Sequence, residues 1–160
     1  RMLVGGEDIK FIARRMMILA AEDIGLANPN ALVMANNCFQ AINVIGNPEA
    51  RIILSETAVY LAVSPKSNST YNAINEAMAF VKKTGNLPVP LHLRNAPTKL
   101  MKDLDYGKDY QYAHSYEGNF VDLEFLPDEI KGTAFYEPAN NSTEKKIKEQ
   151  LKDKWGDKYD

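Results

Sequence analysis

The stretch that decides the fold is ANPNALVMANNCFQAINVIGNPE, residues 27–49, because it contains the signals for both ends of one helix. Asn28 is a residue type that caps helices, Pro29 suits a first helical position, and Gly46 is typical of the residue beyond a helix end. Apolar residues between these ends recur at three- and four-residue steps and predict one buried face. That face contains Ala31, Ala35, Cys38, Ile42 and Ile45, and it is widened by Leu32 and Phe39.

Similar signals for helix starts and ends occur on both sides of this helix. Upstream, Asp8 can cap a helix that ends at Gly25 and whose apolar face is formed by Ile9, Ile12, Met16 and Leu19. Downstream, 47–49 starts a third helix that Ser64 and Pro65 stop, and a fourth begins at Ser67 or Asn68 and ends before Gly85. The pattern therefore predicts a helical core over about residues 7–85.

The third predicted helix is apolar on most of its sides. Its apolar residues do not form a single stripe; they are Ile52, Ile53, Leu54, Ala58, Val59, Tyr60, Leu61 and Val63. A helix of this kind is buried on most sides, so it is either central in the domain or covered by another chain. We take Ile52, Ile53 and Tyr60 as candidate subunit contacts.

Beyond Gly85 the chain is rich in proline and glycine. We predict an irregular segment over about 86–140 that wraps the helical core, with a short helix from about Pro97 to Leu104 and a small hairpin pairing 110–114 with 121–125. A polar helix over about 142–155 follows, capped by Ser142 or Thr143. Its charges are expected to be solvated, and its narrow apolar stripe is Ile147, Leu151 and Trp155. The fold class is mainly α, in a single domain over 1–160.

Composition limits the classes of function. The chain has 160 residues, 45% of them hydrophobic, and 21 acidic against 19 basic side chains, so it lacks the positive excess that non-specific phosphate binding needs. Cys38 is the only cysteine, which excludes an internal disulfide and a zinc-binding thiolate cluster. We find no apolar run of membrane-spanning length and no signal peptide, and we expect an intracellular, cytoplasmic protein.

The segment 89–114 concentrates chemically active side chains. A hydrolase would use His92 or His114 as a base and Ser115 or Thr98 as a nucleophile, but no motif specifies such a geometry. We favour histidines that bond backbone carbonyls or pack beside tyrosines. The hypothesis of a metal site has even less support, because the two histidines are far apart in the sequence and no third ligand is spaced to either of them.

Anion binding is a better supported alternative for this region, because positive charge is locally in excess. Between positions 82 and 108 six basic residues (Lys82, Lys83, Arg94, Lys99, Lys102, Lys108) stand against Asp103 and Asp105. Such a patch could bind DNA or an acidic protein tail, or it could be solvated surface. No phosphate-binding loop of the G-x-x-x-x-G-K-[ST] or G-x-G-x-x-G type occurs in the sequence. The candidate subunit or partner contacts in this region are His92, Arg94, Asn95, Lys99, Lys108, Tyr110 and His114.

Several phrases of the sequence carry a family resemblance. They are GGEDIKFIARRMMILAAEDIGLANPNAL (5–32), PEARIILSETAVYLAVSPKSNSTYNAI (48–74), PLHLRNAPTKLMKDLDYGKDYQYAH (90–114), FLPDEIKG (125–132) and FYEP (135–138). The chain resembles the C-terminal domain of the replication-associated recombination protein A family of AAA+ ATPases, which includes Werner-helicase-interacting protein. One departure concerns 106–110, where Asp109 stands in place of an expected glycine and weakens anion binding at that turn.

The resemblance implies a helical oligomerisation domain similar to the collar of clamp loaders. The implied role is to hold subunits together as a homo-oligomer, commonly a tetramer, of a DNA-dependent ATPase that serves stalled replication forks, recombination and repair. ATP and Mg²⁺ would bind in a domain N-terminal to this segment, so no cofactor and no ATP hydrolysis are expected here. DNA and a single-stranded-DNA-binding protein are implied partners of the full-length ATPase, at the bacterial nucleoid.

Overall fold

The computed structural model describes residues 1–158, and every regular element in that range is helical. The chain divides into two compact units, one formed by 1–76 and 135–148 and the other by 77–134 and the residues from 149 on. Two helices, α4 (Ser69–Thr84) and α6 (Ser142–Trp155), contribute their first part to the first unit and the rest to the second. The irregular segment predicted over 86–140 therefore lies partly in each unit.

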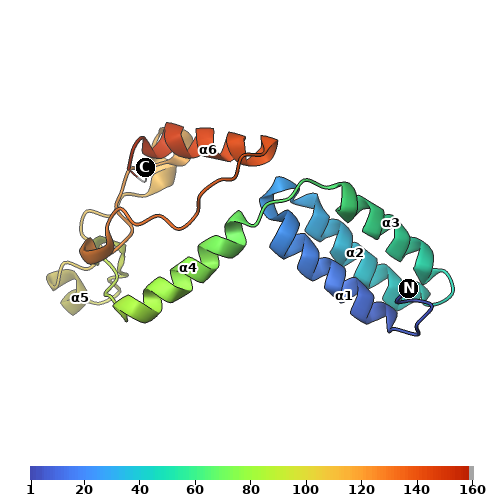
Figure 1. Cartoon of the computed structure of the whole chain (residues 1–160). Coiled ribbons are helices and arrows are strands. Elements are labelled where there is room, and N and C mark those ends of the chain that lie inside the picture. The colour runs from blue at the N-terminus through green and yellow to red at the C-terminus, as the bar shows by residue number, and fades with distance from the viewer. Residues whose placement is uncertain (159–160) are drawn as a thin grey trace. The chain divides into compact units, whose positions relative to one another are not determined.

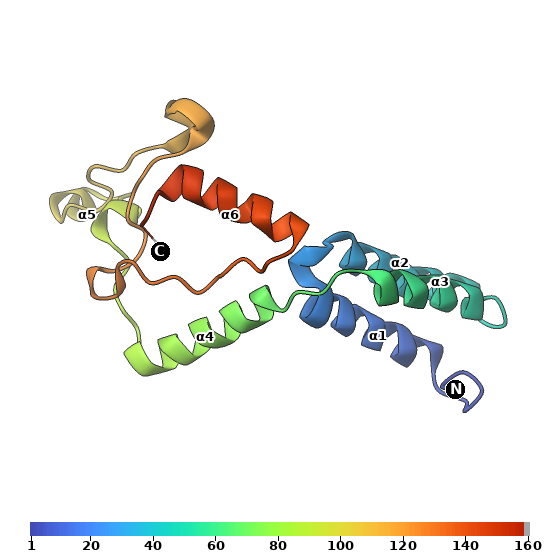
Figure 2. The same ribbon diagram turned by 45° about the horizontal axis from the view of Figure 1, so that its top comes forward.

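The first unit is built on three helices that contact one another pairwise, α1 (Ile9–Leu19), α2 (Asn30–Ile45) and α3 (Ala50–Val63), and they lie side by side in Figures 1 and 2. A π-helical turn and a 3-10 turn connect α1 to α2. The buried residues form two clusters: Ile12, Ala13, Cys38, Ile42, Ala50 and Leu54, and Ala20, Ile24, Ala31, Ala35 and Leu61. Small side chains in both clusters allow the helices to approach closely.

The predicted ends are confirmed for α3, for the start of α1 and for the end of α2 at Gly46. The α-helix α1 ends earlier than predicted, at Leu19, and a π-helical turn continues to Ile24. The start of α2 is corrected, because Pro29 precedes the helix. Asp8 caps α1 by accepting a hydrogen bond from the Lys10 amide at 2.9 Å. The side chain of Asn28, predicted to cap α2, instead donates to the Tyr60 hydroxyl at 3.1 Å and to Ser64 Oγ at 3.0 Å. Asn28 Oδ1, the atom that a cap would use, accepts from the Tyr60 hydroxyl at 3.5 Å instead of from a backbone amide of α2. Asn28 therefore joins the start of α2 to the end of α3.

The predicted buried face of α2 is confirmed except at its ends. Ala31, Ala35, Cys38 and Ile42 are buried, whereas Ile45 is 51% exposed. Ile45 is the last residue of the helix, and the chain leaves it at Gly46 with a positive φ of 70°, so no further turn packs over its side chain. Leu32, expected to widen the face, is exposed as well, while Phe39 packs on the core.

A buried carboxylate fastens the returning chain to the first unit. Glu144 is fully buried and accepts hydrogen bonds from Ser69 Oγ, from Tyr136 Oη at 3.0 Å and from Asn141 Nδ2 at 2.5 Å. Burial alone raises the pKa of Glu144, but hydrogen bonds from Ser67, Ser69 and Asn141 outweigh it and lower this pKa to about 2. Burial and the bond to Glu144 raise the pKa of Tyr136 to about 12.

The start of α6 differs from the prediction in two ways. Its amides at Thr143 and Glu144 donate to Asn141 Oδ1, so Asn141 is the cap rather than Ser142 or Thr143. The Thr143 hydroxyl donates instead to the Ala27 carbonyl at 3.1 Å. The prediction of a wholly solvated charged surface fails at Glu144, because this side chain faces α4 and the preceding segment inside the first unit.

The second unit contains little regular structure. Its elements are the last part of α4, the short helix α5 (Lys99–Asp103), the end of α6 and the 3-10 turns Leu91–Leu93, Ala113–Ser115, Glu117–Asn119 and Asp128–Ile130. The helix predicted from about Pro97 begins later because Thr98 is its cap and accepts from the Met101 amide at 3.3 Å. No helix in the described range is both long and apolar enough to cross a membrane.

The predicted hairpin does not form, since neither 110–114 nor 121–125 is a strand. Phe120 and Phe125 both pack edge-on against the indole of Trp155, with ring centroids 4.8 and 6.1 Å away. Two residues five positions apart point to opposite faces of a strand, so a regular strand could not bring both rings to one indole. Packing on Trp155 therefore replaces strand pairing.

Candidate functional site

The candidate residues on α3 divide between core and surface. Ile53 packs against the buried cluster of the first unit, and the Tyr60 hydroxyl bonds to Asn28 of the same chain. Ile52 is 55% exposed. Two further apolar residues on the same helical face are also exposed, Val59 at 61% and Val63 at 76%. Of the three α3 candidates, only Ile52 therefore presents most of its side chain to the outside.

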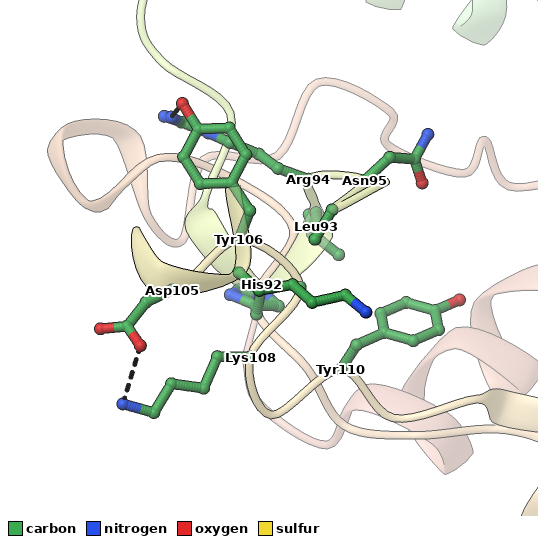
Figure 3. Close-up of a pocket in the computed structure, with 11 residues that line it drawn as sticks. His92, Leu93, Arg94, Asn95, Asp105, Tyr106, Lys108 and Tyr110 are labelled. Carbon is green, nitrogen blue, oxygen red and sulfur yellow. Dashed lines mark hydrogen bonds and ion pairs between the residues drawn. The ribbon is translucent and has the colours of Figure 1, made fainter. Parts of the chain in front are cut away.

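The remaining candidates lie in the second unit, where five of them line one pocket of about 630 Å³ (Figure 3). The predicted members are His92, Arg94, Asn95, Lys108 and Tyr110. Lys99 and His114 do not line this pocket. The further lining residues are Leu93, Ala96, Lys102, Asp105, Tyr106 and Gly107.

The pocket forms because the chain around Gly107 folds back on the 3-10 turn Leu91–Leu93. The Gly107 amide donates to the Leu91 carbonyl at 2.8 Å, and Gly107 has a positive φ of 69°. A Cβ at this position would lie 3.1 Å from the Arg94 carbonyl oxygen, so the close approach favours a glycine. Asp109, where the family resemblance led us to expect glycine, also has a positive φ, of 62°.

Arg94 is held in place by uncharged oxygens. Its Nε donates to the Val89 carbonyl at 2.6 Å and its Nη1 to the Tyr106 hydroxyl at 3.1 Å. The guanidinium carbon lies 5.0 Å from the centroid of the Tyr106 ring, which adds a cation–π contact. Arg94 thus lies half-buried in a fixed position, and no carboxylate of the described residues forms an ion pair with it.

Lys108 differs from Arg94 because an acidic residue of the same pocket neutralises it. Its Nζ lies 3.1 Å from Asp105 Oδ1, the contact drawn in Figure 3. The hydrogen bond to Asp105 and the charge of that carboxylate raise the pKa of Lys108. Both side chains are more than half exposed, so this pair contributes little to folding stability.

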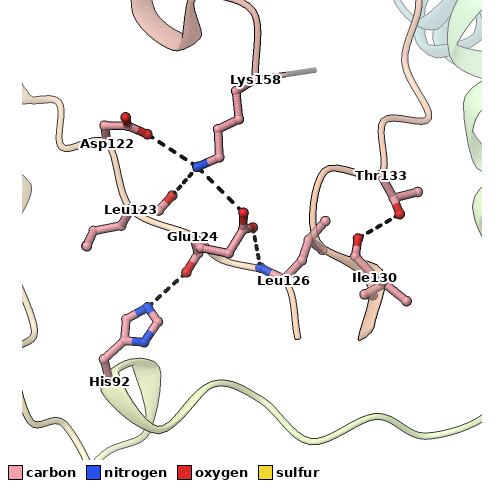
Figure 4. A network of polar contacts seen from close by, with 8 residues as sticks. All are labelled: His92, Asp122, Leu123, Glu124, Leu126, Ile130, Thr133 and Lys158. Atoms are coloured by element: carbon pink, nitrogen blue, oxygen red, sulfur yellow. Dashed lines mark hydrogen bonds and ion pairs between the residues drawn. The ribbon is translucent and has the colours of Figure 1, made fainter. Parts of the chain in front are cut away.

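His92 serves the structure of the second unit. Its Nε2 lies 2.9 Å from the Glu124 carbonyl oxygen (Figure 4), which fixes the orientation of the ring. Glu124 Oε1 accepts from the Leu126 amide, and its Oε2 lies 3.8 Å from Lys158 Nζ. Lys158 also donates to the Leu123 carbonyl and to Asp122. These contacts tie the turn that follows α6 to the segment 122–126.

The hydrolase alternative finds no support in this geometry. Thr98 caps α5, and neither Thr98 nor Ser115 is among the described residues that line the pocket. His114 lies outside it, with Nδ1 3.2 Å from Asn119 Oδ1 and its ring beside Tyr112. Over residues 1–158, no group of three or more His, Cys, Asp or Glu side chains is arranged to hold a metal ion.

Sequence reasoning missed three residues that matter to the pocket: Lys102, Asp105 and Tyr106. Lys102 belongs to the basic run, but the sequence does not distinguish it from Lys99, and only the folded structure places Lys102 in the pocket lining. Tyr106 and Asp105 act through contacts with Arg94 and Lys108. No sequence motif marks these contacts.

Comparison with known proteins agrees with an all-helical C-terminal domain of an AAA+ ATPase. The profile of the family described as MgsA AAA+ ATPase C terminal matches residues 1–155, and the chain belongs to this family.

Its relatives include replication-associated recombination protein A of Coxiella burnetii, 47% identical over 152 residues, and that of Escherichia coli K12, 40% identical over 152 residues. Each alignment covers 94% of this chain and 34% of the relative. ATPase WRNIP1 of Dictyostelium discoideum is 42% identical over 154 residues, which is 96% of this chain and 18% of the relative. The chain thus spans about a third or less of the length of these relatives.

Proposed function

We propose that the chain is a homo-oligomerisation domain, most simply for a tetramer, of a DNA-dependent AAA+ ATPase that acts in replication-fork maintenance, recombination and repair. The observation that carries this proposal is the exposed stripe of Ile52, Val59 and Val63 on α3. These residues are seven and four positions apart, so they share one face of the helix. The buried residues Leu54, Thr57 and Leu61 are on the other side.

A second copy of the chain is the occupant that best fits this stripe. Single exposed apolar residues are ordinary, but three on one helical face give an apolar surface that association can remove from water. Neighbouring α2 also has exposed apolar side chains, on more than one of its faces: Leu32, Val33, Val44 and Ile45. Glu56 shares this face and lies between Ile52 and Val59 along the helix, so an interface there has to pair this carboxylate or leave it solvated.

Sedimentation equilibrium of the chain tests the proposal. We expect an oligomer at micromolar concentration and a monomer for Ile52→Asp combined with Val59→Asp, since buried carboxylates oppose association. The matched control is Val81→Asp, because Val81 is 56% exposed and belongs to the second unit. A monomeric parent chain, or equal loss of association in the control, would contradict the proposal.

Within this proposal the chain itself does not hydrolyse ATP. We propose that ATP and Mg²⁺ bind in a part of the parent protein that this chain does not cover. The chain covers 34% and 18% of two relatives. We place the parent at the bacterial nucleoid in the cytoplasm. DNA and a single-stranded-DNA-binding protein are the proposed partners of the full-length ATPase.

A second candidate function is a binding module for an anionic partner, DNA or an acidic tail. One observation favours it: Arg94, Lys102 and Lys108, from the basic segment 82–108, line the same pocket. Such binding should weaken as salt rises and be reduced in Arg94→Ala. Fluorescence anisotropy with labelled oligonucleotides and acidic peptides over a salt series measures both effects, and unchanged affinity would contradict them.

A further inference from the structure

We propose that the pocket around Arg94 and Lys102 binds the C-terminal carboxylate of a peptide whose last side chain is apolar. This inference rests on the second candidate function, the binding module, and specifies its ligand class. It does not depend on oligomerisation, because every residue that lines the pocket belongs to the second unit.

The charge available in the pocket is that of two cations. Arg94 is held by uncharged oxygens, and among the described residues Lys102 forms no ion pair. The positive charge of Lys108 is already offset by Asp105. Two uncompensated cations in one concave site suit a single carboxylate, which accepts hydrogen bonds from both of its oxygens.

Arg94 is already ordered for such a ligand. A guanidinium has five N–H groups, and bonds to Val89 and Tyr106 use two of them, so three donors remain. Stacking on Tyr106 restricts the side chain further. A carboxylate would therefore meet a donor that loses little conformational entropy on binding.

The rest of the lining suits an apolar side chain next to the carboxylate. Leu93 and Ala96 supply aliphatic surface, and Tyr106 and Tyr110 supply aromatic rings. Tyr110 is 56% exposed, so its ring is accessible to a ligand. A volume of about 630 Å³ is in the range of sites that hold small ligands, and it is ample for one terminal residue and the peptide bond before it.

The acidic residues near the pocket favour one carboxylate over a polyanion. Asp105 lines the pocket, and Asp103 and Asp109 flank lining residues in sequence. A nucleic-acid strand brings a phosphate at every nucleotide and requires several cations, whereas the whole chain carries a net charge of −2. Stacking of bases on tyrosines is the competing mode, and the experiment below separates the two.

The test titrates the isotopically labelled 160-residue chain with an acetylated hexapeptide, Gly-Ser-Gly-Ser-Ala-Leu, that has a free carboxylate. Nuclear magnetic resonance detects binding even at millimolar dissociation constants and locates it. We expect shifts in the amide signals of 92–96 and 102–110. We also expect the same peptide with a C-terminal amide to bind at least about tenfold more weakly, because it lacks the charge-assisted hydrogen bonds.

Variants locate the site. Lys102→Ala should weaken binding of the free acid severalfold, whereas Lys99→Ala, on the same helix but outside the pocket, should leave it unchanged. Arg94→Lys keeps the positive charge but loses the paired N–H donors of the guanidinium, so it should also weaken binding. Because Arg94 also supports the local fold, Lys102→Ala decides the matter if Arg94→Lys alters the spectrum without ligand.

Three results would overturn the inference. Equal shifts with acid and amide would exclude carboxylate recognition, and shifts caused by free acetate alone would show that the peptide is not needed. A short thymidine oligonucleotide that shifts the same signals while the peptide does not would reject the ligand class but retain the binding module. No shift with any probe would overturn both.

Discussion

At the scale of single residues, Glu144 shows how a carboxylate can be buried with no ion pair to any residue of 1–158. Its carboxylate is held by hydroxyl and amide donors of Ser69, Tyr136 and Asn141. These bonds favour the charged form strongly enough to lower its pKa despite burial. Folding therefore gains free energy from Glu144 only while the side chain is ionised.

This leads to a pH-dependent prediction. The folded-state pKa of Glu144 is about 2 and its ordinary value is 4.5, so its contribution is complete above pH 4.5 and is lost as pH falls towards 2. We expect Glu144→Gln to lower the free energy of unfolding at pH 7 by about 2–3 kcal/mol. The difference from the parent should shrink over that pH window, as measured by urea denaturation followed by circular dichroism.

Glu149 provides the control for this measurement. It lies on the same helix, is exposed, and Glu149→Gln should leave stability unchanged at every pH. A Glu144→Gln deficit that stays constant from pH 7 to 2 would show that the loss of a hydrogen-bond acceptor, rather than of the charge, is responsible.

A second residue-scale prediction concerns Gly25, between the π-helical turn and α2. Its φ is 48°, and a Cβ there would lie 2.8 Å from the Ser67 carbonyl oxygen. Gly25→Ala should therefore cost about 2–4 kcal/mol of stability, from backbone strain together with a clash against backbone. Thermal denaturation of the variant measures the loss.

Gly46 is the matched control for Gly25→Ala. It also has a positive φ, 70°, but nothing lies within 4 Å of a Cβ built on it. Gly46→Ala should cost only about 1 kcal/mol, which isolates the backbone strain. Equal losses at the two sites would mean that the contact with Ser67 does not matter.

At the scale of elements, the helices of the first unit are joined by polar as well as apolar contacts. Asn28, before α2, bonds to Tyr60 and Ser64 at the end of α3. The Ser67 amide donates to the Asp23 carbonyl at 2.8 Å, which holds the start of α4 to the turn after α1. These bonds fix the registers of helices whose cores consist largely of small residues.

A double-mutant cycle tests the link between α2 and α3. Asn28→Ala should lower the free energy of unfolding by about 1–2 kcal/mol and Tyr60→Phe by about 1 kcal/mol, because each removes a part-buried hydrogen bond. The double variant should lose less than the sum, since the two share one bond. Tyr71→Phe is the control at an exposed tyrosine, and strict additivity would contradict a direct contact.

At the scale of the whole molecule, the exposed stripe on α3 connects stability to association. If copies of the chain assemble through Ile52, Val59 and Val63, only the folded chain presents this surface. The folded state is then stabilised by mass action. The same surface makes an isolated copy less well solvated than a chain that buries its apolar residues internally.

The prediction is a melting temperature that depends on protein concentration. For the parent chain we expect a rise of about 2–5 °C for each tenfold increase in concentration. The combined variant Ile52→Asp and Val59→Asp should show no such rise. Calorimetry over two decades of concentration measures it, and a concentration-independent melting temperature of the parent would argue against assembly through folded chains.

The amino-acid sequence by itself determined the helices and part of the core of this protein. Periodic apolar residues and terminal signals such as Asp8, Gly46 and Ser64 are local, because they depend on hydrogen bonds and side-chain directions within a few residues. For the same reason the burial of Cys38 and the span of α6 could be predicted. Phrases such as 90–114 were enough to recognise the family.

Tertiary structure alone decided which polar side chains serve the fold and which form the pocket. Asn28 and Glu144 find partners 32 to 75 positions away in the chain, and Trp155 draws Phe120 and Phe125 to one indole in place of a hairpin. The same holds for Lys102, Asp105 and Tyr106, whose roles follow from the start of α5 and the turn at Gly107. Hydrogen bonds and ring contacts between distant segments have no sequence periodicity, so only the folded chain reveals them.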